Sequence, residues 1–252
     1  KKEFTKTIRK EFRTQSDGLV ELTNKHGDIE ITTWDENRVS VKVIITVDAC
    51  DEDDAQQVFD RIAIDFTNQS KYVSAQTSIT DKGKNWWKSL KGCETSYSID
   101  YLVSMPASNN LIVENKYGDI YIDELEREAE VILSYGNLRM EGVRDNLQLE
   151  FAYGNGFIVK AGNNLQAEIR YGKTKITEVG NARIESKYST IEIESCEKLE
   201  SETKYDRYYV GEAKVFINTG KYDNFQLDEV QEIDIETQYS DLKVNELYKA
   251  MN

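Results

Sequence analysis

A tyrosine returns at nearly constant spacing through the second half of the chain, and this repeat constrains the fold more than any other feature. The eight copies are Tyr117, Tyr135, Tyr153, Tyr171, Tyr188, Tyr205, Tyr222 and Tyr239. The first four copies share one constant spacing, and from Tyr171 onward the spacing is shorter by a single position. A fixed period of this kind is typical of a solenoid or another stacked array.

Each unit of the repeat has the pattern of two strands joined by corners. Apolar residues alternate with polar ones before the tyrosine, as in Leu147, Leu149 and Phe151, and this period of two indicates a strand with one buried face. Two turn residues follow the tyrosine, such as Gly118-Asp119, and these types tolerate positive φ in a tight corner. Apolar positions resume three, five and eight residues after the tyrosine, which predicts a short second strand and a looser corner.

Two architectures satisfy this pattern. In a parallel solenoid equivalent residues stack about 4.8 Å apart, whereas in an antiparallel meander the Gly-Asp and Gly-Asn corners would be hairpin turns. Eight tyrosines in identical context favour the solenoid, because a stack of coils gives each of them the same surroundings. We therefore predict an all-β fold with a parallel β-solenoid of about eight 17–18-residue coils over residues 111–252, preceded by an N-terminal region over 1–110.

The N-terminal region contains one early copy of the repeat and an insertion. His26, the only histidine, occupies the tyrosine position before Gly27-Asp28, and we expect its ring to fill the same corner rather than to serve a metal or a catalytic reaction. Residues 38–110 are expected to form a cap with one helix over 51–61 and alternating strands. No comparable cap follows the last coil, so its edge is expected to be shielded by charges or paired with another molecule.

The composition excludes several classes of function. The net charge of −14 disfavours nucleic acid and anionic lipid as partners. No apolar run approaches the roughly 20 residues of a membrane span.

Three cysteines are too few for a disulfide framework: Cys196 is predicted to be a buried free thiol, and Cys50 and Cys93 could pair. The chain starts with polar, strand-like sequence, which we interpret as a chain without its signal peptide.

These pieces together resemble a family of bacterial putative adhesins that has long been classed as domains of unknown function. The matching residues, in chain order, are Glu3-Phe4-Thr5-Lys6-Thr7, Gly27-Asp28-Ile29-Glu30-Ile31 with Trp34, the strand Tyr97 to Met105 with Pro106, and Asn115-Lys116-Tyr117-Gly118-Asp119-Ile120. The resemblance implies a right-handed β-helix-like fold, a secreted, periplasmic or cell-surface location in a Gram-negative bacterium, and an adhesion role. It transfers no catalytic residue. Later corners such as Tyr188-Ser189 and Tyr205-Asp206 depart from the glycine of the pattern.

The tyrosine column has a structural and a functional interpretation. In the alternation of the strand, each tyrosine falls on the same side as the leucines before it, so the tyrosines are expected to face inward or to line a corner. A fully buried ring would contribute about 4–6 kcal/mol as an upper bound. Binding of sugars or conduction of charge along the rings is the alternative, and we favour a structural ladder.

Two outward columns of charge accompany the tyrosines. Glutamates stand three residues before the tyrosine at Glu114, Glu150, Glu168, Glu185, Glu202 and Glu236, and cations one residue before it at Lys116, Arg170, Lys187, Lys204 and Lys221. In a solenoid the two columns lie side by side. A solvated face of mixed charge is the simpler interpretation, and a surface for cations or a charged glycan is the alternative.

The best candidate for recognition is the polar, locally basic segment that holds Trp86 and Trp87, together with Lys84 and Lys88. Adjacent residues of a strand point to opposite sides, so one of the two rings can be exposed, and exposed aromatic residues mark binding sites for sugars or proteins. Packing of both rings on the cap is the alternative.

Catalytic patterns are absent from the sequence. It has no Gly-x-Ser-x-Gly elbow, zinc spacing, Walker loop or dinucleotide fingerprint, and no cofactor or metal is expected. We therefore expect a non-enzymatic, extracytoplasmic binding or spacer protein whose partner is a glycan or a surface protein. An envelope scaffold or signalling partner is the second hypothesis, and a carbohydrate-active enzyme on a β-helix scaffold is the third.

Overall fold

The second half of the chain is a stack of coils whose strands pair in parallel with their equivalents in the neighbouring coils. The computed structural model describes residues 1–80 and 95–250. The earlier coils give two short strands each: β8 (Asn110–Lys116), β9 (Ile120–Leu125), β10 (Ala129–Ser134), β11 (Leu138–Val143), β12 (Asn146–Ala152), β13 (Asn155–Ala161) and β14 (Asn164–Arg170). The later coils give one long strand each: β15 (Lys173–Lys187), β16 (Thr190–Lys204), β17 (Arg207–Lys221), β18 (Asn224–Gln238) and β19 (Asp241–Ala250).

The pairing register follows the tyrosine spacing. Leu147 lies opposite Leu165, and Ile191 lies opposite Tyr208, so each partner stands one full period of the repeat further along the chain. This confirms the parallel solenoid and excludes the antiparallel meander. The later coils are one residue shorter than the earlier ones, and the missing residue is at the looser corner. There the two strands of a coil join into one long strand, such as the 15 residues of β16.

Each coil has two flat faces joined at a sharp corner that contains the tyrosine. We call face A the outward side of β8, β10, β12, β14 and the second halves of β15–β18. Face B is the outward side of β9, β11, β13, the first halves of β15–β18, and β19. Side chains that point inward from both faces form one continuous apolar core, in which Leu133, Met140 and Ile184 have no exposed surface.

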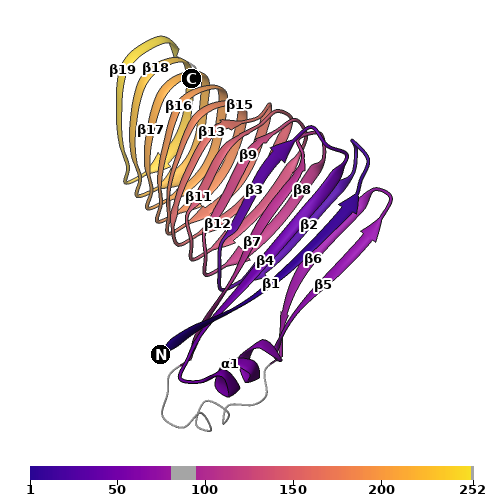
Figure 1. Ribbon diagram of the computed structural model, residues 1–252. Helices are drawn as coiled ribbons and strands as arrows, with labels where there is room; N and C mark the ends of the chain where they lie inside the picture. The colour runs from indigo at the N-terminus through magenta and orange to yellow at the C-terminus, as the bar shows by residue number, and fades with distance from the viewer. Residues whose placement is uncertain (81–94, 251–252) are drawn as a thin grey trace.

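The N-terminal region extends both faces at one end of the stack (Figure 1). Its elements are β1 (Lys2–Arg13), β2 (Leu19–Lys25), β3 (Ile29–Trp34), β4 (Arg38–Ala49), α1 (Glu52–Phe59), β5 (Ile62–Gln69), β6 (Tyr72–Ile79) and β7 (Ser96–Pro106). β2 and β3 pair with β8 and β9 as a first coil. Beyond them β6 and β5 continue face A, and β7, β4 and β1 continue face B. The division into units at residue 110 stays a prediction.

The helix begins where the sequence indicates. Asp51 is its N-cap, and the Asp51 side chain accepts a hydrogen bond from the backbone N–H of Asp54 at 2.9 Å. Acidic residues in the first turn complement the helix dipole. Ala55, Val58 and Phe59 are buried, and the helix contacts β4 and β1.

The sharp corner differs from the prediction in one respect. Positive φ belongs to the tyrosine itself, at 53° to 63°, and not to the residues that follow it. The glycine after the tyrosine is required for space, because a Cβ at Gly136 would lie 2.0 Å from the carbonyl oxygen of Gly118, and one at Gly154 would lie 1.8 Å from that of Gly136. Adjacent coils therefore approach backbone to backbone at this corner.

The later corners replace glycine by side chains that bind the neighbouring coil. The Asp206 carboxylate accepts from the backbone N–H of Ser189 at 2.7 Å, and the Asp223 carboxylate accepts from that of Asp206 at 2.8 Å. The tyrosines before them keep positive φ, for example 61° at Tyr205. The departure from glycine therefore leaves the corner's backbone conformation unchanged.

The structure also tests the sequence predictions about the cysteines and about membrane-spanning segments. Cys196 is free and buried, as predicted, and burial raises the pKa of its thiol to about 12. Cys50 is disulfide-bonded, and Cys93 lies outside the described residues. Among the described residues no helix is both long and apolar enough to cross a membrane.

Candidate binding surfaces

The most regular surface feature is a ridge of stacked rings along the sharp corner, which we call the tyrosine ridge. Its members are His26 and the eight tyrosines of the repeat. Neighbouring rings lie 4.6–5.2 Å apart between centroids, with interplanar angles of 1° to 24°. The tyrosines are 43–49% exposed, and the terminal Tyr239 is 79% exposed. Of the two placements expected for these rings, inside the core or along a corner, the structure shows the second, because the left-handed backbone turns each ring onto the corner.

His26 continues the ridge at its N-terminal end. Its φ is 66°, and its ring stacks on Tyr117 at 5.2 Å and meets the edge of the Tyr97 ring at 5.4 Å. Burial, together with nearby Lys25 and Lys116, lowers the pKa of His26. The imidazole therefore fills the tyrosine's corner, as the sequence predicts, and is neutral near pH 7.

The stacking limits what the ridge can do chemically. Each inner ring has both faces covered by its neighbours, so a ligand can reach only the ring edges and hydroxyl groups. Stacking of a sugar on a ring face is therefore restricted to the terminal Tyr239. The ridge offers a straight row of phenol hydroxyls rather than a set of aromatic platforms.

The two charged columns lie beside the ridge on face A. Glu168, Glu185 and Glu202 occupy successive coils in register, and the cation column runs parallel to them. Lys116 lies over the Tyr117 and Tyr135 rings, at 5.0 and 5.8 Å from their centroids. A groove of about 400 Å³ follows these columns from coil to coil. The charges alternate across it, so the groove has no strong preference for a cation or an anion.

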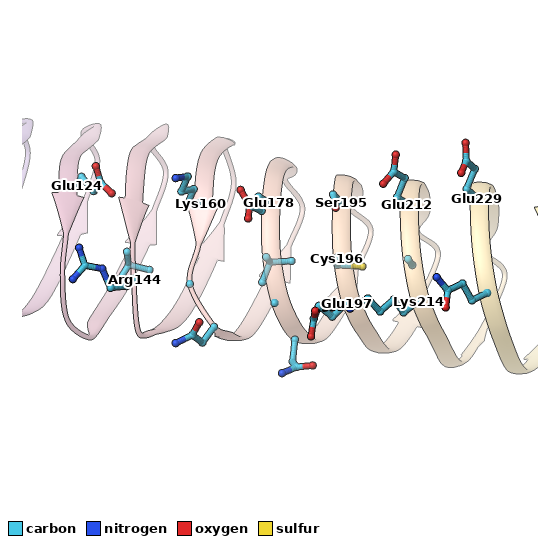
Figure 2. A pocket seen from close by; sticks show the side chains of 18 of the residues that line it. Glu124, Arg144, Lys160, Glu178, Ser195, Cys196, Glu197, Glu212, Lys214 and Glu229 are labelled. Atoms are coloured by element: carbon cyan, nitrogen blue, oxygen red, sulfur yellow. Dashed lines mark hydrogen bonds and ion pairs between the residues drawn. The ribbon is translucent and has the colours of Figure 1, made fainter.

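A second groove, of about 730 Å³, follows the looser corner on the side of face B (Figure 2). Side chains of Glu178, Glu212 and Glu229 stand in one row along it, with Ser195 between the first two and Lys160 before Glu178. Below them the Lys214 ammonium pairs with Glu197 at 2.6 Å. The described part of the chain holds no group of acidic, histidine and cysteine side chains with the spacing of a metal site.

A third groove, of about 740 Å³, lies on face A near the looser corner, and its lining combines six amide side chains with apolar and charged residues. Asparagines stand in register at the start of three successive strands, at Asn146, Asn164 and Asn181. Gln148 and Gln166 form a second row two residues further along the strands. We did not predict this amide groove, although the return of asparagine at the same place in three successive units was a visible signal.

Two carboxyl groups with raised pKa lie inside the last coils, where the enzyme hypothesis would need them at a surface. Burial raises the pKa of Asp206 to about 6, and burial also raises the pKa of Asp223. Asp206 is 2% exposed and accepts from the Ser186 hydroxyl at 2.8 Å, and Asp223 is 4% exposed and accepts from the Thr203 hydroxyl at 2.8 Å. Their hydrogen bonds hold the corner, so they are corner caps and not an acid–base pair in a cleft.

The predicted recognition segment cannot be compared with these surfaces. Lys84, Trp86, Trp87 and Lys88 lie outside the described residues. Their role stays a prediction.

Comparisons with known proteins support the fold. No family model and no curated protein matches the chain. Among solved structures, a putative adhesin from Bacteroides fragilis NCTC 9343 matches with a TM-score of 0.51 at 12% identity, over 95% of this chain and 97% of the other. A putative lipid binding protein from Parabacteroides distasonis ATCC 8503 (TM-score 0.47, 12% identity, 98% and 97% covered) and a putative adhesin from Parabacteroides merdae ATCC 43184 (0.46, 12%, 94% and 97%) also match. The resemblance to putative adhesins is thereby confirmed, and at these identities it shows a shared fold.

Proposed function

We propose that the chain is a non-enzymatic binding protein with an adhesin-like role that engages an extended partner along its side. The observation that carries this proposal is the register of the outward columns on face A and the tyrosine ridge. Because equivalent residues repeat about every 4.8 Å, the same chemistry is offered to a partner at each coil. Such a surface suits a linear glycan or an elongated surface protein better than a small molecule.

Two further observations support an extracytoplasmic location. The Cys50 disulfide suits an oxidising compartment, since disulfides persist outside the cytosol. The solved structure with the same fold from Bacteroides fragilis carries the description putative adhesin. These observations support our proposal that the protein works in the periplasm, on the surface or in the secretions of a Gram-negative bacterium.

A binding array of glycans and matrix proteins tests the proposal with two variants beside the wild type. Trp86→Ala/Trp87→Ala removes the predicted recognition segment. Tyr153→Phe/Tyr171→Phe/Tyr188→Phe removes three ridge hydroxyls and keeps the stacked rings, so the melting curve should not change.

Each array result has a definite meaning. Loss of binding in the tryptophan variant alone assigns recognition to Trp86 and Trp87, and loss in the tyrosine variant alone assigns it to the ridge. Absence of binding by the wild type to every ligand contradicts an adhesin-like role toward these classes and favours the envelope scaffold hypothesis.

A further inference from the structure

One row of amides in the groove on face A is held in a preorganised orientation. The Asn164 amide nitrogen donates to the Asn146 oxygen at 2.9 Å, and the Asn181 nitrogen donates to the Asn164 oxygen at 3.3 Å. The Asn146 nitrogen donates to Glu128 at 2.8 Å, which fixes the end of the row. These bonds hold the amide planes in one orientation over three coils, and each amide keeps a second N–H.

The second row of amides has no structural partner. Gln148 and Gln166 lie in register on β12 and β14, and both are exposed. Neither makes a side-chain hydrogen bond or an ion pair within the described part of the chain, so stacking of the coils does not account for them. Between the two rows the groove is closed below by Leu147 and Leu165. Its volume of about 740 Å³ falls within the range of ligand sites.

The chemistry of the groove selects the class of ligand. An amide both donates and accepts, as does a hydroxyl group, whereas a phosphate, sulfate or carboxylate ligand requires donors alone. The charged side chains that line the groove are of both signs, Glu128, Glu130 and Glu200 against Arg183 and Lys198, so a polyanion gains no net attraction there. A peptide strand is disfavoured, because its backbone groups pair with the edge of a sheet and this groove lies on a sheet face.

We propose that the amide groove binds a neutral, hydroxyl-rich polysaccharide that runs along the stack, with successive sugar units against successive coils. This inference rests on the proposed binding function and specifies its ligand class and site. The glutamine row makes the specific contacts, and the asparagine row provides a fixed set of donors beside it.

Affinity gel electrophoresis in soluble dextran, xylan and mannan tests the proposal, with polygalacturonate as the charged comparison. The wild type should be retarded by at least one neutral polymer and not by polygalacturonate. Gln148→Ala/Gln166→Ala should weaken binding about tenfold or more. Its melting temperature should stay within about 2 °C of the wild type, because both side chains are exposed. Gln69→Ala/Gln76→Ala, two exposed glutamines outside the groove, is the matched control and should bind as the wild type does.

The outcomes separate this inference from the proposed function. Retardation of the wild type that the double variant retains would overturn the site, and retardation by polygalacturonate alone would overturn the ligand class. A wild type that binds array proteins but no neutral polymer overturns the inference and leaves the binding function standing. Binding to a protein ligand that is lost in Gln148→Ala/Gln166→Ala would reassign the groove to a protein partner and so overturn the inference as stated.

Discussion

Replacing Tyr171 by alanine and by glycine separates two contributions that this residue makes at the corner. The ring stabilises the coil through burial and through stacking on Tyr153 and Tyr188 at 5.0 and 5.1 Å. The backbone opposes it, because Tyr171 has φ of 53°, a left-handed conformation that is unfavourable for residues with a Cβ. Alanine removes the ring and keeps the unfavourable backbone, whereas glycine removes both.

The magnitudes follow from the exposure of the ring. Tyr171 is 49% exposed, so about 100 Å² of a large aromatic side chain is buried, which corresponds to about 2.5 kcal/mol. Allowing for the two stacked contacts and for the compactness of the unfolded chain, Tyr171→Ala should lower the free energy of unfolding by about 2–4 kcal/mol. Tyr171→Gly should be about 1 kcal/mol less destabilising than Tyr171→Ala, since glycine adopts positive φ without a steric penalty.

Urea denaturation followed by far-ultraviolet circular dichroism measures both variants. Ala152 provides the control, because it lies on face A beside the ridge in a strand of ordinary conformation, where glycine should be about 0.5–1 kcal/mol less stable than alanine. The glycine form should therefore be more stable than the alanine form at position 171 and less stable than it at position 152. Stacked coils can unfold in steps, so midpoints are compared only where the denaturant slope is unchanged.

One result would refute this reasoning. If Tyr171→Ala is as stable as Tyr171→Gly, or more stable, while Ala152→Gly shows the ordinary cost, then the left-handed conformation does not constrain the corner. The tyrosine would then be retained for its ring alone.

Three other perturbations test the corner and the interior. Gly136→Ala should lower the free energy of unfolding by about 3 kcal/mol, because its Cβ would lie 2.0 Å from a carbonyl oxygen of the preceding coil. Gly142→Ala should be tolerated, because the nearest atom to its Cβ lies 3.4 Å away. Equal thermal midpoints for the two variants would contradict the close approach. Burial raises the pKa of Asp206 to about 6, so the native state holds its proton more tightly than the unfolded chain does; this stabilisation is complete below about pH 4 and is lost as the pH rises through about 6, a change of about 3 kcal/mol. Asp206→Ser should reduce that slope in urea midpoints measured from pH 4 to 7, and an unchanged slope would place the titration elsewhere. The Cys196 thiol, buried with a pKa of about 12, should react with a thiol reagent only as fast as its coil opens, so rapid labelling under native conditions would contradict its burial.

The stack could be predicted from the sequence because inward positions obey simple alternation. Leu147, Leu149 and Phe151 are buried where a period of two places them, and the constant spacing of the tyrosines gave the parallel register. The tyrosine's own direction could not be predicted in this way. Alternation left two placements open, inside the core or along the corner, and only the left-handed backbone, which the pattern does not reveal, turns the ring outward.

The candidate surfaces were less predictable than the fold, because outward positions are free to vary from coil to coil. The glutamate and lysine columns follow directly from the period once the coils are known to stack. The asparagine row extends over three coils only, and the two rows become one surface only when Gln148 and Gln166 are placed in register with the asparagines. A surface built from side chains of several coils can be recognised in the sequence only if the same residue types recur in every coil.

Charge at the two ends of the stack argues that recognition belongs to its sides. Lys6 and Lys10 of the end strand β1 lie opposite the buried Ile45 and Val41, so these lysines sit on the core-facing side of an edge strand. At the other end of the stack the second half of β18, which is the last strand of face A, carries the acidic residues Asp234 and Glu236. Charges in such places hinder the addition of a further strand. An end strand of face B and the last strand of face A thus carry such charges, which favours accommodation of a partner along the sides of the stack, as on face A, where polar side chains recur in register.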